Sequence, residues 1–384
     1  MPWKVQSVMD ERIRFVVEAI PGRSSMSSLC REFGISRPTG YRWLSRYRET
    51  GRVADLRERS RRPSRSPRRT AEAIVDQVIS LRLAHGWGAR KLQLLLWNAG
   101  VRVGESTVNR ILKRQGLQYE PEVVGQATTR FSRQAPNELW QMDFKGPYFM
   151  DSERCCPLSI VDDHSRYAVG LYALNNQRAE SVHRSLVHTF ERYGVPQAML
   201  VDHGAPWYSS SGPGLTWLGV ALIKQGVHLH FSGVRHPQTQ GKVERFHRTL
   251  SHSIRHHGRH DDLSNWQRAF DDFTATYNHL RPHESLEMAV PATRYQPSPR
   301  TYQPQPSTWE YPLGATVKRL NVQGQLSWRG RYYFVSEALA AEHVEISRCA
   351  DTLMIRYRHM WIRKIDLKTG HSETLIDKHH NPYV

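Results

Sequence analysis

The sequence predicts a multidomain fold with an all-α N-terminal region, a central α/β domain and a small all-β C-terminal module. Helical apolar spacing occurs twice before residue 120. After residue 137, short runs of β-branched and aromatic residues alternate with amphipathic helical stretches, and turn-separated short strands follow a proline-spaced segment near residue 300. A chain of 384 residues is also long for one domain, so two or three domains are expected.

The charge balance is strongly positive. Lys and Arg number 54 against 36 Asp and Glu, which gives a formal net charge of +18. Residues 1–120 hold 24 Lys and Arg and 11 Asp and Glu, so +13 of that charge lies there. This distribution predicts a polyanionic partner and argues against an acidic cytosolic enzyme of small metabolites. No apolar run approaches the ~18 residues of a membrane span and no secretory signal is visible, which predicts a cytoplasmic protein without membrane association.

Residues 1–51 form the first predicted DNA-binding domain, a helix-turn-helix. Leu29 and Phe33 lie four residues apart, Gly34 interrupts the helical pattern, and Ser36 can cap a second helix. Gly40 inside that helix costs ~1 kcal/mol relative to Ala and obscures the helix boundary. Three arginines fall off the apolar face, where a recognition helix needs its DNA contacts: Arg37, Arg42 and Arg46.

A second helix-turn-helix domain is predicted over residues 71–120. Glycine-containing breaks at residues 86–88 and 99–100 separate three apolar helical stretches, and Ser106 can cap the last one. The basic residues on the outer face of that helix are candidate DNA contacts: Arg110, Lys113 and Arg114. Either block alone is consistent with a small helical bundle whose basic residues face water, whereas two blocks in tandem favour DNA binding.

Residues 52–70 join the two helical blocks and contain eight arginines together with prolines and serines. This composition cannot bury apolar surface, so an extended linker is expected. The linker is either a solvated spacer or an arm along a phosphate backbone, and the preference for arginine favours the arm because guanidinium binds phosphate bidentately. The candidate phosphate contacts are Arg61, Arg62, Arg65, Arg68 and Arg69. Residues 121–136 are predicted to be a second linker.

The central domain, residues 137–295, places three acidic residues on three predicted elements. Alternation over residues 139–145 puts Asp143 on the polar face of a strand. Asp202 ends a buried apolar run, at the kind of strand end where open α/β sheets bind ligands. Glu244 lies on the polar stripe of an amphipathic helix.

Each acid alone has a purely structural explanation, since a strand-end Asp is usually a turn residue and a helical Glu usually faces water. Together the three acids fit one chemistry. Mg²⁺ prefers oxygen ligands, and two ions ~3.5–4 Å apart can hold the attacking and the leaving oxygen of a phosphodiester. We therefore expect Asp143, Asp202 and Glu244 to be catalytic ligands of two Mg²⁺ ions, with Mn²⁺ as a substitute.

Several polar residues close to these acids in the sequence have weaker interpretations. Helical spacing brings three residues near the glutamate, where they either contact DNA or only solvate that face: Lys242, His247 and Arg248. Asp162 and Asp163 are expected to support the site, with metal ligation as the alternative. Four histidines form a polar helix face rather than a zinc site, because no thiolate pair accompanies them: His252, His256, His257 and His260. The four cysteines of the chain are expected to be reduced and mostly buried.

A proline-spaced linker over residues 296–308 precedes the last predicted domain, residues 309–384. Short apolar stretches separated by glycine and polar turns predict a small β-barrel there. The predicted strands include Val317, Val322, Leu326 and residues 332–335, 344–346 and 353–355.

Five segments resemble the integrase-core DDE transposases of bacterial insertion sequences. The segments are Trp140-Gln-Met-Asp-Phe-Lys-Gly146, Val161-Asp-Asp-His-Ser-Arg166, Val201-Asp-His-Gly204, His236-Pro-Gln-Thr-Gln-Gly-Lys-Val-Glu-Arg-Phe-His-Arg248 and Tyr277-Asn-His-Leu-Arg-Pro-His283. Cys30-Arg-Glu-Phe-Gly-Ile-Ser36 and Leu112-Lys-Arg-Gln-Gly116 extend the similarity to insertion-sequence family four-eight-one, so the resemblance spans nearly the whole chain.

This resemblance implies a ribonuclease-H-like core in which Asp143, Asp202 and Glu244 hold the catalytic metals, and an SH3-like C-terminal barrel. It implies hydrolysis at the ends of the element and in-line attack of the freed 3′-hydroxyl on target DNA, without a covalent enzyme intermediate. The implied partners are double-stranded DNA, as terminal inverted repeats and as target, and further copies of the chain in a dimer or tetramer. The implied location is the bacterial nucleoid.

Two features depart from the family pattern, and two other functions compete with it. His203 stands where Asn is usual, which can alter local charge or metal preference. Asp202 and Glu244 are separated by 41 residues, a long gap, with an extra loop expected at residues 209–214.

One competing function is a non-catalytic, sequence-specific DNA-binding regulator, which the three intact acids disfavour. The other is a ribonuclease-H-like nuclease, which the tandem DNA-reading modules disfavour.

Overall fold

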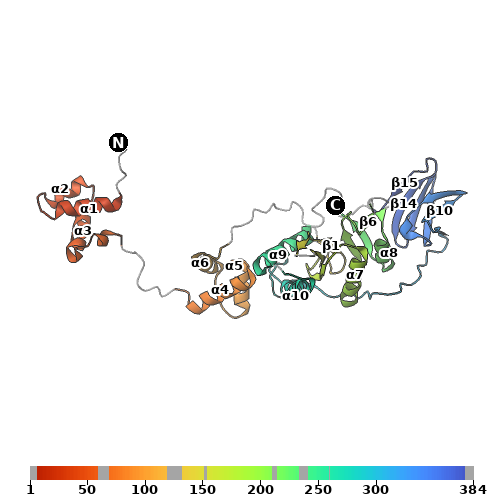
Figure 1. The fold of residues 1–384 in the computed structure, drawn as a ribbon, viewed down its shortest axis with the longest axis horizontal. Helices are drawn as coiled ribbons and strands as arrows, with labels where there is room; N and C mark the ends of the chain where they lie inside the picture. The colour runs from red at the N-terminus through yellow and green to blue at the C-terminus, as the bar shows by residue number, and fades with distance from the viewer. Residues whose placement is uncertain are drawn as a thin grey trace. The chain divides into compact units, whose positions relative to one another are not determined.

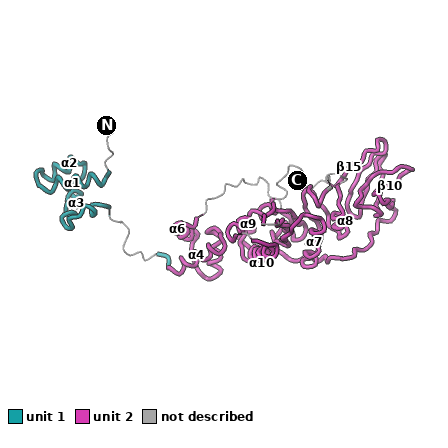
Figure 2. Tube along the Cα trace, viewed as in Figure 1, with its two compact units in different colours: residues 1–71 teal, residues 72–384 magenta. Residues whose placement is uncertain are grey.

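The computed structural model describes residues 7–58, 69–118, 132–150, 154–209, 214–232, 241–258 and 260–376. The chain divides into two compact units, residues 1–71 and residues 72–384 (Figure 2). Within the described ranges, no helix is both long enough and apolar enough to cross a membrane.

The first unit packs three helices around one small core. They are α1 (Val8–Ala19), α2 (Met26–Glu32) and α3 (Arg37–Thr50), followed by the short 3₁₀ helix η1 (Val53–Leu56). Ser36 caps α3 as predicted, because its side chain accepts a hydrogen bond from the Thr39 amide. Gly40 is buried inside α3, where a Cβ would lie 2.6 Å from Cys30 Sγ. The glycine that weakens the helix locally is therefore required for the close packing of α2 against α3.

The second unit begins with the second helical module, which consists of α4 (Glu72–His85), α5 (Ala89–Asn98) and α6 (Glu105–Arg114). Apolar residues from all three helices meet in one buried cluster. The N-cap of α6 is Gly104, so the predicted cap at Ser106 is wrong by two residues. Gly104 takes the extended backbone conformation that a cap position requires, which allows the helix to start earlier than the side chains suggest.

A six-stranded mixed sheet forms the centre of the second unit (Figure 1). The strand order is β2-β3-β1-β5-β8, with β4 also paired to β3. β3 is antiparallel to β1 and β4, whereas β1, β5 and β8 run parallel. The strands are β1 (Trp140–Phe144), β2 (Tyr148–Phe149), β3 (Arg154–Asp162), β4 (Ala168–Leu174), β5 (Ala198–Val201) and β8 (His228–Phe231).

Helices cover both faces of this sheet. On one face, α7 (Ala179–Tyr193) and α8 (Trp217–Lys224) share an apolar cluster with Trp140 and Met142 of β1. On the other face, α9 (Gly241–His257) and α10 (Leu263–His279) pack with Val161 of β3. Period-two alternation along β1 then directs Gln141 and Asp143 toward α9. Shorter elements are the paired strands β6 (Tyr208–Ser209) and β7 (Gly214–Leu215) and the 3₁₀ helices η3 (Glu284–Leu286) and η4 (Pro291–Arg294).

The C-terminal module is all-β, as predicted. One open sheet has the order β15-β14-β13-β12-β9, and β10 and β11 form a separate pair, so closure into a barrel is not confirmed in the described residues. Val322 was expected in a strand but lies in a turn, because the Asn321 side chain accepts hydrogen bonds from two following amides. The elements are β9 (Thr316–Arg319), β10 (Gln325–Trp328), β11 (Arg331–Phe334), η5 (Glu337–Leu339), β12 (His343–Cys349), β13 (Thr352–Tyr357), β14 (Met360–Asp366) and β15 (Ser372–Thr374).

The predicted linker at residues 296–308 lies against the central sheet domain. The Arg300 guanidinium donates a hydrogen bond of 2.9 Å to the Gly226 carbonyl at the end of α8. The C-terminal module contacts the same region, since Lys224 of α8 forms an ion pair of 2.6 Å with Glu342. A single apolar cluster continues from the central sheet into the C-terminal strands. The last module is therefore packed onto the central domain.

Candidate active site

The parallel pairing of β1 and β5 brings two of the predicted acids together. Trp140 is level with Met199, and Gln141 is level with Leu200. The same register, continued toward the carboxyl ends of the strands, sets Asp143 level with Asp202. Level residues on adjacent parallel strands point to the same face, and such strands lie about 4.8 Å apart. The two carboxylates are therefore neighbours at the carboxyl ends of β1 and β5.

Helix α9 supplies the third acid. Val243 and Phe246 are fully buried against the sheet, and Glu244 is exposed on the adjoining face of the helix. Burial raises the pKa of Asp143 from 3.8 to about 7, and the negative charges of Asp202 and Glu244 both add to the rise. Asp143 is therefore within electrostatic reach of both Asp202 and Glu244.

The carboxylates have the chemistry of a cation site. Asp202 Oδ1 is buried and accepts no hydrogen bond from the described residues. Gly204 leaves room for this side chain, because a Cβ there would lie 2.9 Å from Asp202 Oδ2. Asp202 therefore offers a buried oxygen without a hydrogen-bond donor, and the raised pKa of Asp143 shows that its negative charge is poorly stabilised. A divalent cation bound by both carboxylates would stabilise their charges. Among the described residues, no group of three or more His, Cys, Asp or Glu side chains lies close enough together to hold a metal ion.

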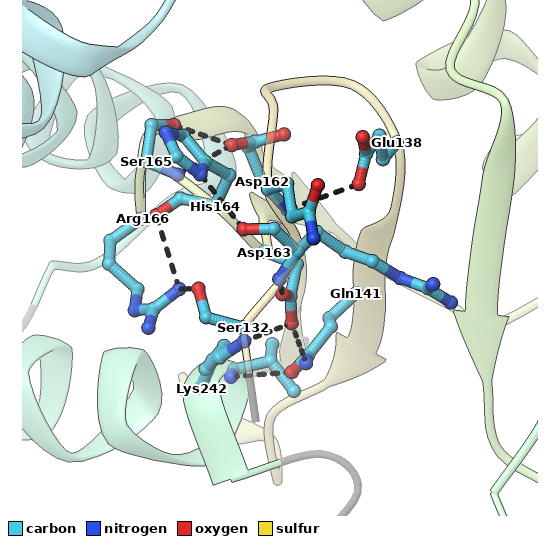
Figure 3. A network of polar contacts seen from close by, with 12 residues as sticks. Ser132, Glu138, Gln141, Asp162, Asp163, His164, Ser165, Arg166 and Lys242 are labelled. Carbon is cyan, nitrogen blue, oxygen red and sulfur yellow. Dashed lines mark hydrogen bonds and ion pairs between the residues drawn. The ribbon is translucent and has the colours of Figure 1, made fainter. Parts of the chain in front are cut away.

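A buried polar network fixes the start of α9 (Figure 3). Asp163 Oδ1 accepts a hydrogen bond of 2.8 Å from Gln141 Nε2 of β1 and forms an ion pair with Lys242 of α9. Gln141 Oε1 accepts a hydrogen bond of 3.3 Å from the Val243 amide. The first amides of a helix have no partner within the helix, and this bond satisfies one of them. The network therefore ties the first turn of α9 to the strand that carries Asp143.

Asp162 anchors the loop that follows β3. Its Oδ1 accepts hydrogen bonds of 2.7 and 2.6 Å from the amide and the hydroxyl of Ser165. Its Oδ2 accepts one of 2.7 Å from the Asn137 amide. Burial raises the pKa of Asp162, although these hydrogen bonds oppose the rise. The oxygens of Asp162 are thus used within the fold.

Two of the three α9 residues predicted to contact DNA are partly buried. Lys242 forms the ion pair with the loop after β3, and burial lowers its pKa to about 8. His247 Nε2 lies 3.0 Å from Ser159 Oγ and its Nδ1 lies 3.8 Å from Asp143 Oδ2. Burial lowers the pKa of His247 to about 4, so its imidazole is neutral at pH 7. Arg248 is exposed. DNA contact by these three residues stays a prediction.

The basic residues of the helical modules differ in their surroundings. Arg37 and Arg42 are exposed. Arg46 lies over the Trp43 ring at 4.7 Å and donates a hydrogen bond of 3.3 Å to the Arg57 carbonyl, so part of its role is within the fold. The candidate DNA contacts on α6 and the described linker candidate are all exposed: Arg110, Lys113, Arg114 and Arg69. The remaining linker candidates lie outside the described residues: Arg61, Arg62, Arg65 and Arg68. Their DNA contacts also stay predictions.

Sequence analysis assigned no function to Gln141 or Lys145. Gln141 shares the polar face of β1 with Asp143 and Lys145 directly follows that strand, so the alternation over residues 139–145 is the signal that could have drawn attention to them. Lys145 Nζ lies 5.3 Å from the Tyr148 ring, and burial, followed by the positive charge of Arg255, lowers its pKa. The positive charge of Lys145 also contributes to lowering the pKa of His247, the residue next to Asp143.

His203, which departs from the family pattern, packs among aromatic rings. Its ring centroid lies 5.1 Å from that of Tyr208 and 5.5 Å from that of Phe231. Most of the loop expected at residues 209–214 lies outside the described residues.

The chain matches four known domain families. Residues 133–237 and residues 225–291 each match a family described as an integrase core domain. Residues 39–112 match a homeodomain-like domain, and residues 11–64 match a helix-turn-helix domain. These matches confirm the predicted helix-turn-helix region and the predicted integrase core.

Similar proteins come from mobile elements and a virus. The chain is 25% identical over 275 residues to the transposase for transposon Tn552 of Staphylococcus aureus. This alignment covers 64% of this chain but only 55% of the length of that protein. It is 23% identical over 229 residues to an uncharacterized 31.7 kDa protein of insertion element IS407 from Burkholderia multivorans. That alignment covers 58% of this chain and 80% of that protein. A solved intasome of simian T-cell lymphotropic virus, in complex with PP2A regulatory subunit B56 gamma, aligns with a TM-score of 0.40 and 13% identity over 74% of this chain and 95% of the matched one. The central part of the chain therefore matches integrase core domains, its N-terminal part matches helix-turn-helix domains, and its relatives of 23–25% identity come from mobile elements.

Proposed function

We propose that this protein is the transposase of an insertion sequence. It binds the terminal inverted repeats, cleaves a strand at the end of the element, and joins the resulting 3′-hydroxyl to target DNA. The observation that supports this proposal is the electrostatic effect of Asp202 and Glu244 on Asp143, whose pKa burial and these two charges raise to about 7. Neighbouring carboxylates of this kind are suited to holding cations next to a phosphodiester.

The three acids would hold divalent cations, with two Mg²⁺ ions as the proposed complement and Mn²⁺ as a substitute. Bound Mg²⁺ would supply Lewis-acid stabilisation of the phosphoryl oxygens. The support for this fit is the unpaired, buried Oδ1 of Asp202 and the all-carboxylate donor set.

The surrounding residues of the chain orient these acids. Gln141 and Lys242 hold the first turn of α9 and so position Glu244. Gly204 gives the Asp202 carboxylate room to lie as it does. His247 Nδ1 lies 3.8 Å from Asp143 Oδ2, and its imidazole is neutral, so it adds no positive charge that would compete with a cation.

The proposed partner of the helical modules is double-stranded DNA. α3 and α6 would act as recognition helices on the terminal inverted repeats, with the arginine-rich linker along the phosphates between them. Pairing two ends of an element requires more than one active site, so a dimer or tetramer is proposed. The C-terminal module would contact DNA or a second copy of the chain, as an SH3-like domain.

The test is cleavage and joining of a labelled duplex that carries the element's own end, with Mg²⁺ or with EDTA. Wild type is compared with Glu244→Gln and with Glu191→Gln, an exposed glutamate of α7 that serves as a matched control. We expect nicking and joining by wild type and by the control. EDTA or Glu244→Gln should abolish both reactions and leave end binding intact.

The competing functions give different results. Tight, specific binding without metal-dependent nicking, even when two ends are supplied together, would indicate a non-catalytic regulator. Preferential cleavage of branched or RNA–DNA hybrid substrates would indicate a nuclease. Asp202→Asn should likewise stop cleavage but not binding, and loss of binding would show that the acids have a structural role instead.

A further inference from the structure

A positively charged cavity of about 780 Å³ lies between the second helical module and helices α9 and α10. Among the described residues that line it, six are Lys or Arg and a single one, Asp272, is acidic. Direct contacts join the two walls. His256 Nε2 of α9 lies 2.6 Å from the Leu83 carbonyl oxygen of α4, and Lys91 Nζ of α5 pairs with Glu284 Oε1 at 3.3 Å. The cavity is therefore built into the junction between the module and the helix that carries Glu244.

Three cations from three separate segments line this cavity: Lys91 of α5, Arg245 of α9 and Arg281, which follows α10. Glu284 pairs with Lys91. Within the described residues, neither the Arg245 nor the Arg281 guanidinium forms an ion pair, and Arg281 Nε is buried without a hydrogen-bond partner. Buried guanidinium nitrogens normally find oxygen acceptors, so Arg281 Nε lacks the partner that its chemistry requires, while the exposed Arg245 guanidinium is available to a ligand.

The charges in this cluster repel one another. Burial lowers the pKa of Lys91, and the positive charges of Arg281 and Arg245 lower it further. Burial also lowers the pKa of Arg281, and Arg245 adds to that effect. An anion with several oxygen acceptors would remove the repulsion and satisfy the guanidinium groups bidentately.

We propose that this cavity binds a phosphate group of the DNA backbone, and that Lys91, Arg245 and Arg281 hold it. The bound phosphate would belong to the DNA whose end reaches the active site. The cavity extends from Asn109 and Leu112 of α6, the predicted recognition helix, to α9, so DNA read by α6 would pass this cluster. Its volume of about 780 Å³ is that of a site for a larger ligand and exceeds what one free phosphate ion fills. The inference rests on the proposed function, because the polyanion is taken to be the end of the element.

The test measures how the affinity for a fluorescent duplex carrying the element's end depends on salt, using the full chain without divalent metal. Each phosphate contact contributes a slope of about −0.9 to the plot of log affinity against log salt concentration. Arg245→Gln and Arg281→Gln should each reduce the magnitude of the slope by about 1 and weaken binding at low salt. Arg268→Gln is the matched control, because Arg268 is an exposed arginine of α10 outside the cavity, and it should leave the slope unchanged.

Arg245 is exposed, so Arg245→Gln keeps the test available if Arg281→Gln does not fold. Slopes of both variants equal to that of the control would overturn the proposal. The proposal would also fail if inorganic phosphate raised the thermal midpoint of wild type but not of Arg281→Gln while the DNA slope stayed the same, since the cavity would then be a free-anion site. Cleavage that depends on Glu244 with unaltered slopes would refute this inference alone. Altered slopes without any metal-dependent cleavage would refute the proposed catalytic function alone.

Discussion

Asp143→Asn should stabilise the metal-free protein at pH 8. The pKa of Asp143 rises from 3.8 to about 7 in the folded chain, so the folded state binds more protons than the unfolded state between these two values. Stability therefore falls as the pH rises through this window, and the shift corresponds to about 4 kcal/mol at pH 8. The Asp143 side chain is 23% exposed, so solvent screens part of this effect. We therefore expect Asp143→Asn to raise the free energy of unfolding at pH 8 by about 1–3 kcal/mol.

The same shift predicts how this gain depends on pH. At pH 5 the folded wild type is already mostly protonated at Asp143, so the advantage of Asp143→Asn should fall to less than half of its value at pH 8. Scanning calorimetry of the full chain in EDTA at both pH values measures this difference. For a unit of this size, each kcal/mol of stability shifts the thermal midpoint by about 2 °C. Asp261→Asn, at an exposed acid before α10, is the control and should change the midpoint at neither pH.

Mg²⁺ gives an independent measure of the same group. A cation binds the ionised carboxylate, so Mg²⁺ should raise the midpoint of wild type more at pH 8 than at pH 5 and should raise that of Asp143→Asn less at both. If Asp143→Asn were no more stable than wild type at pH 8 in EDTA, or if its advantage did not shrink toward pH 5, the acids would not be coupled as the structure indicates.

Three further predictions follow from individual contacts. Gly204→Ala places a Cβ 2.9 Å from Asp202 Oδ2, so strand cleavage should fall about 10- to 100-fold through displacement of the carboxylate, while DNA affinity, measured on the same labelled duplex, should not change. Gln141→Leu leaves Asp163 and the Val243 amide each without one buried hydrogen bond, which should cost about 1–3 kcal/mol in calorimetry of the second unit and should slow cleavage; an unchanged midpoint would refute the role of this network. Gly40→Ala forces a Cβ to 2.6 Å from a buried thiol, so hydrogen exchange of the α1–α3 amides should accelerate by the equivalent of about 1–3 kcal/mol, and unaltered exchange would show that the bundle tolerates the methyl group.

The central sheet and its acids could be predicted because each strand encodes its own pattern. Residues 139–145 alternate between apolar and polar side chains, and the strand found there, β1, buries Trp140 and Met142 on the face opposite Asp143. Asp202 follows a continuous apolar run, which is typical of a strand buried on both faces. The register that makes Asp143 and Asp202 level depends on pairing between segments more than 50 residues apart, and neither segment contains that information alone.

The C-terminal module shows where local patterns fail. β14 was absent from the predicted strands, because Arg363 and Lys364 interrupt its apolar residues. In the structure Arg363 is buried and its guanidinium lies 5.9 Å from the Phe334 ring, so a charged residue occupies a core position that its type does not suggest. The packing of residues 296–308 on the central domain was also hidden, since prolines and glutamines carry no apolar periodicity.

Helix α9 explains why the candidate site was predicted only in part. The sequence distinguishes its apolar stripe from its polar one, but it treats all polar positions as equivalent. In the structure these positions have three different surroundings. Glu244 is exposed beside the acids of the sheet, Lys242 forms an ion pair with buried Asp163, and Arg245 lines the cavity shared with the second helical module. Which neighbour each position meets is set by β1, the loop after β3 and α5, segments between about 80 and 150 residues away in the chain. The same helix therefore connects the acids to the module proposed to read DNA, and a strand held by that module would be presented along α9 to Glu244.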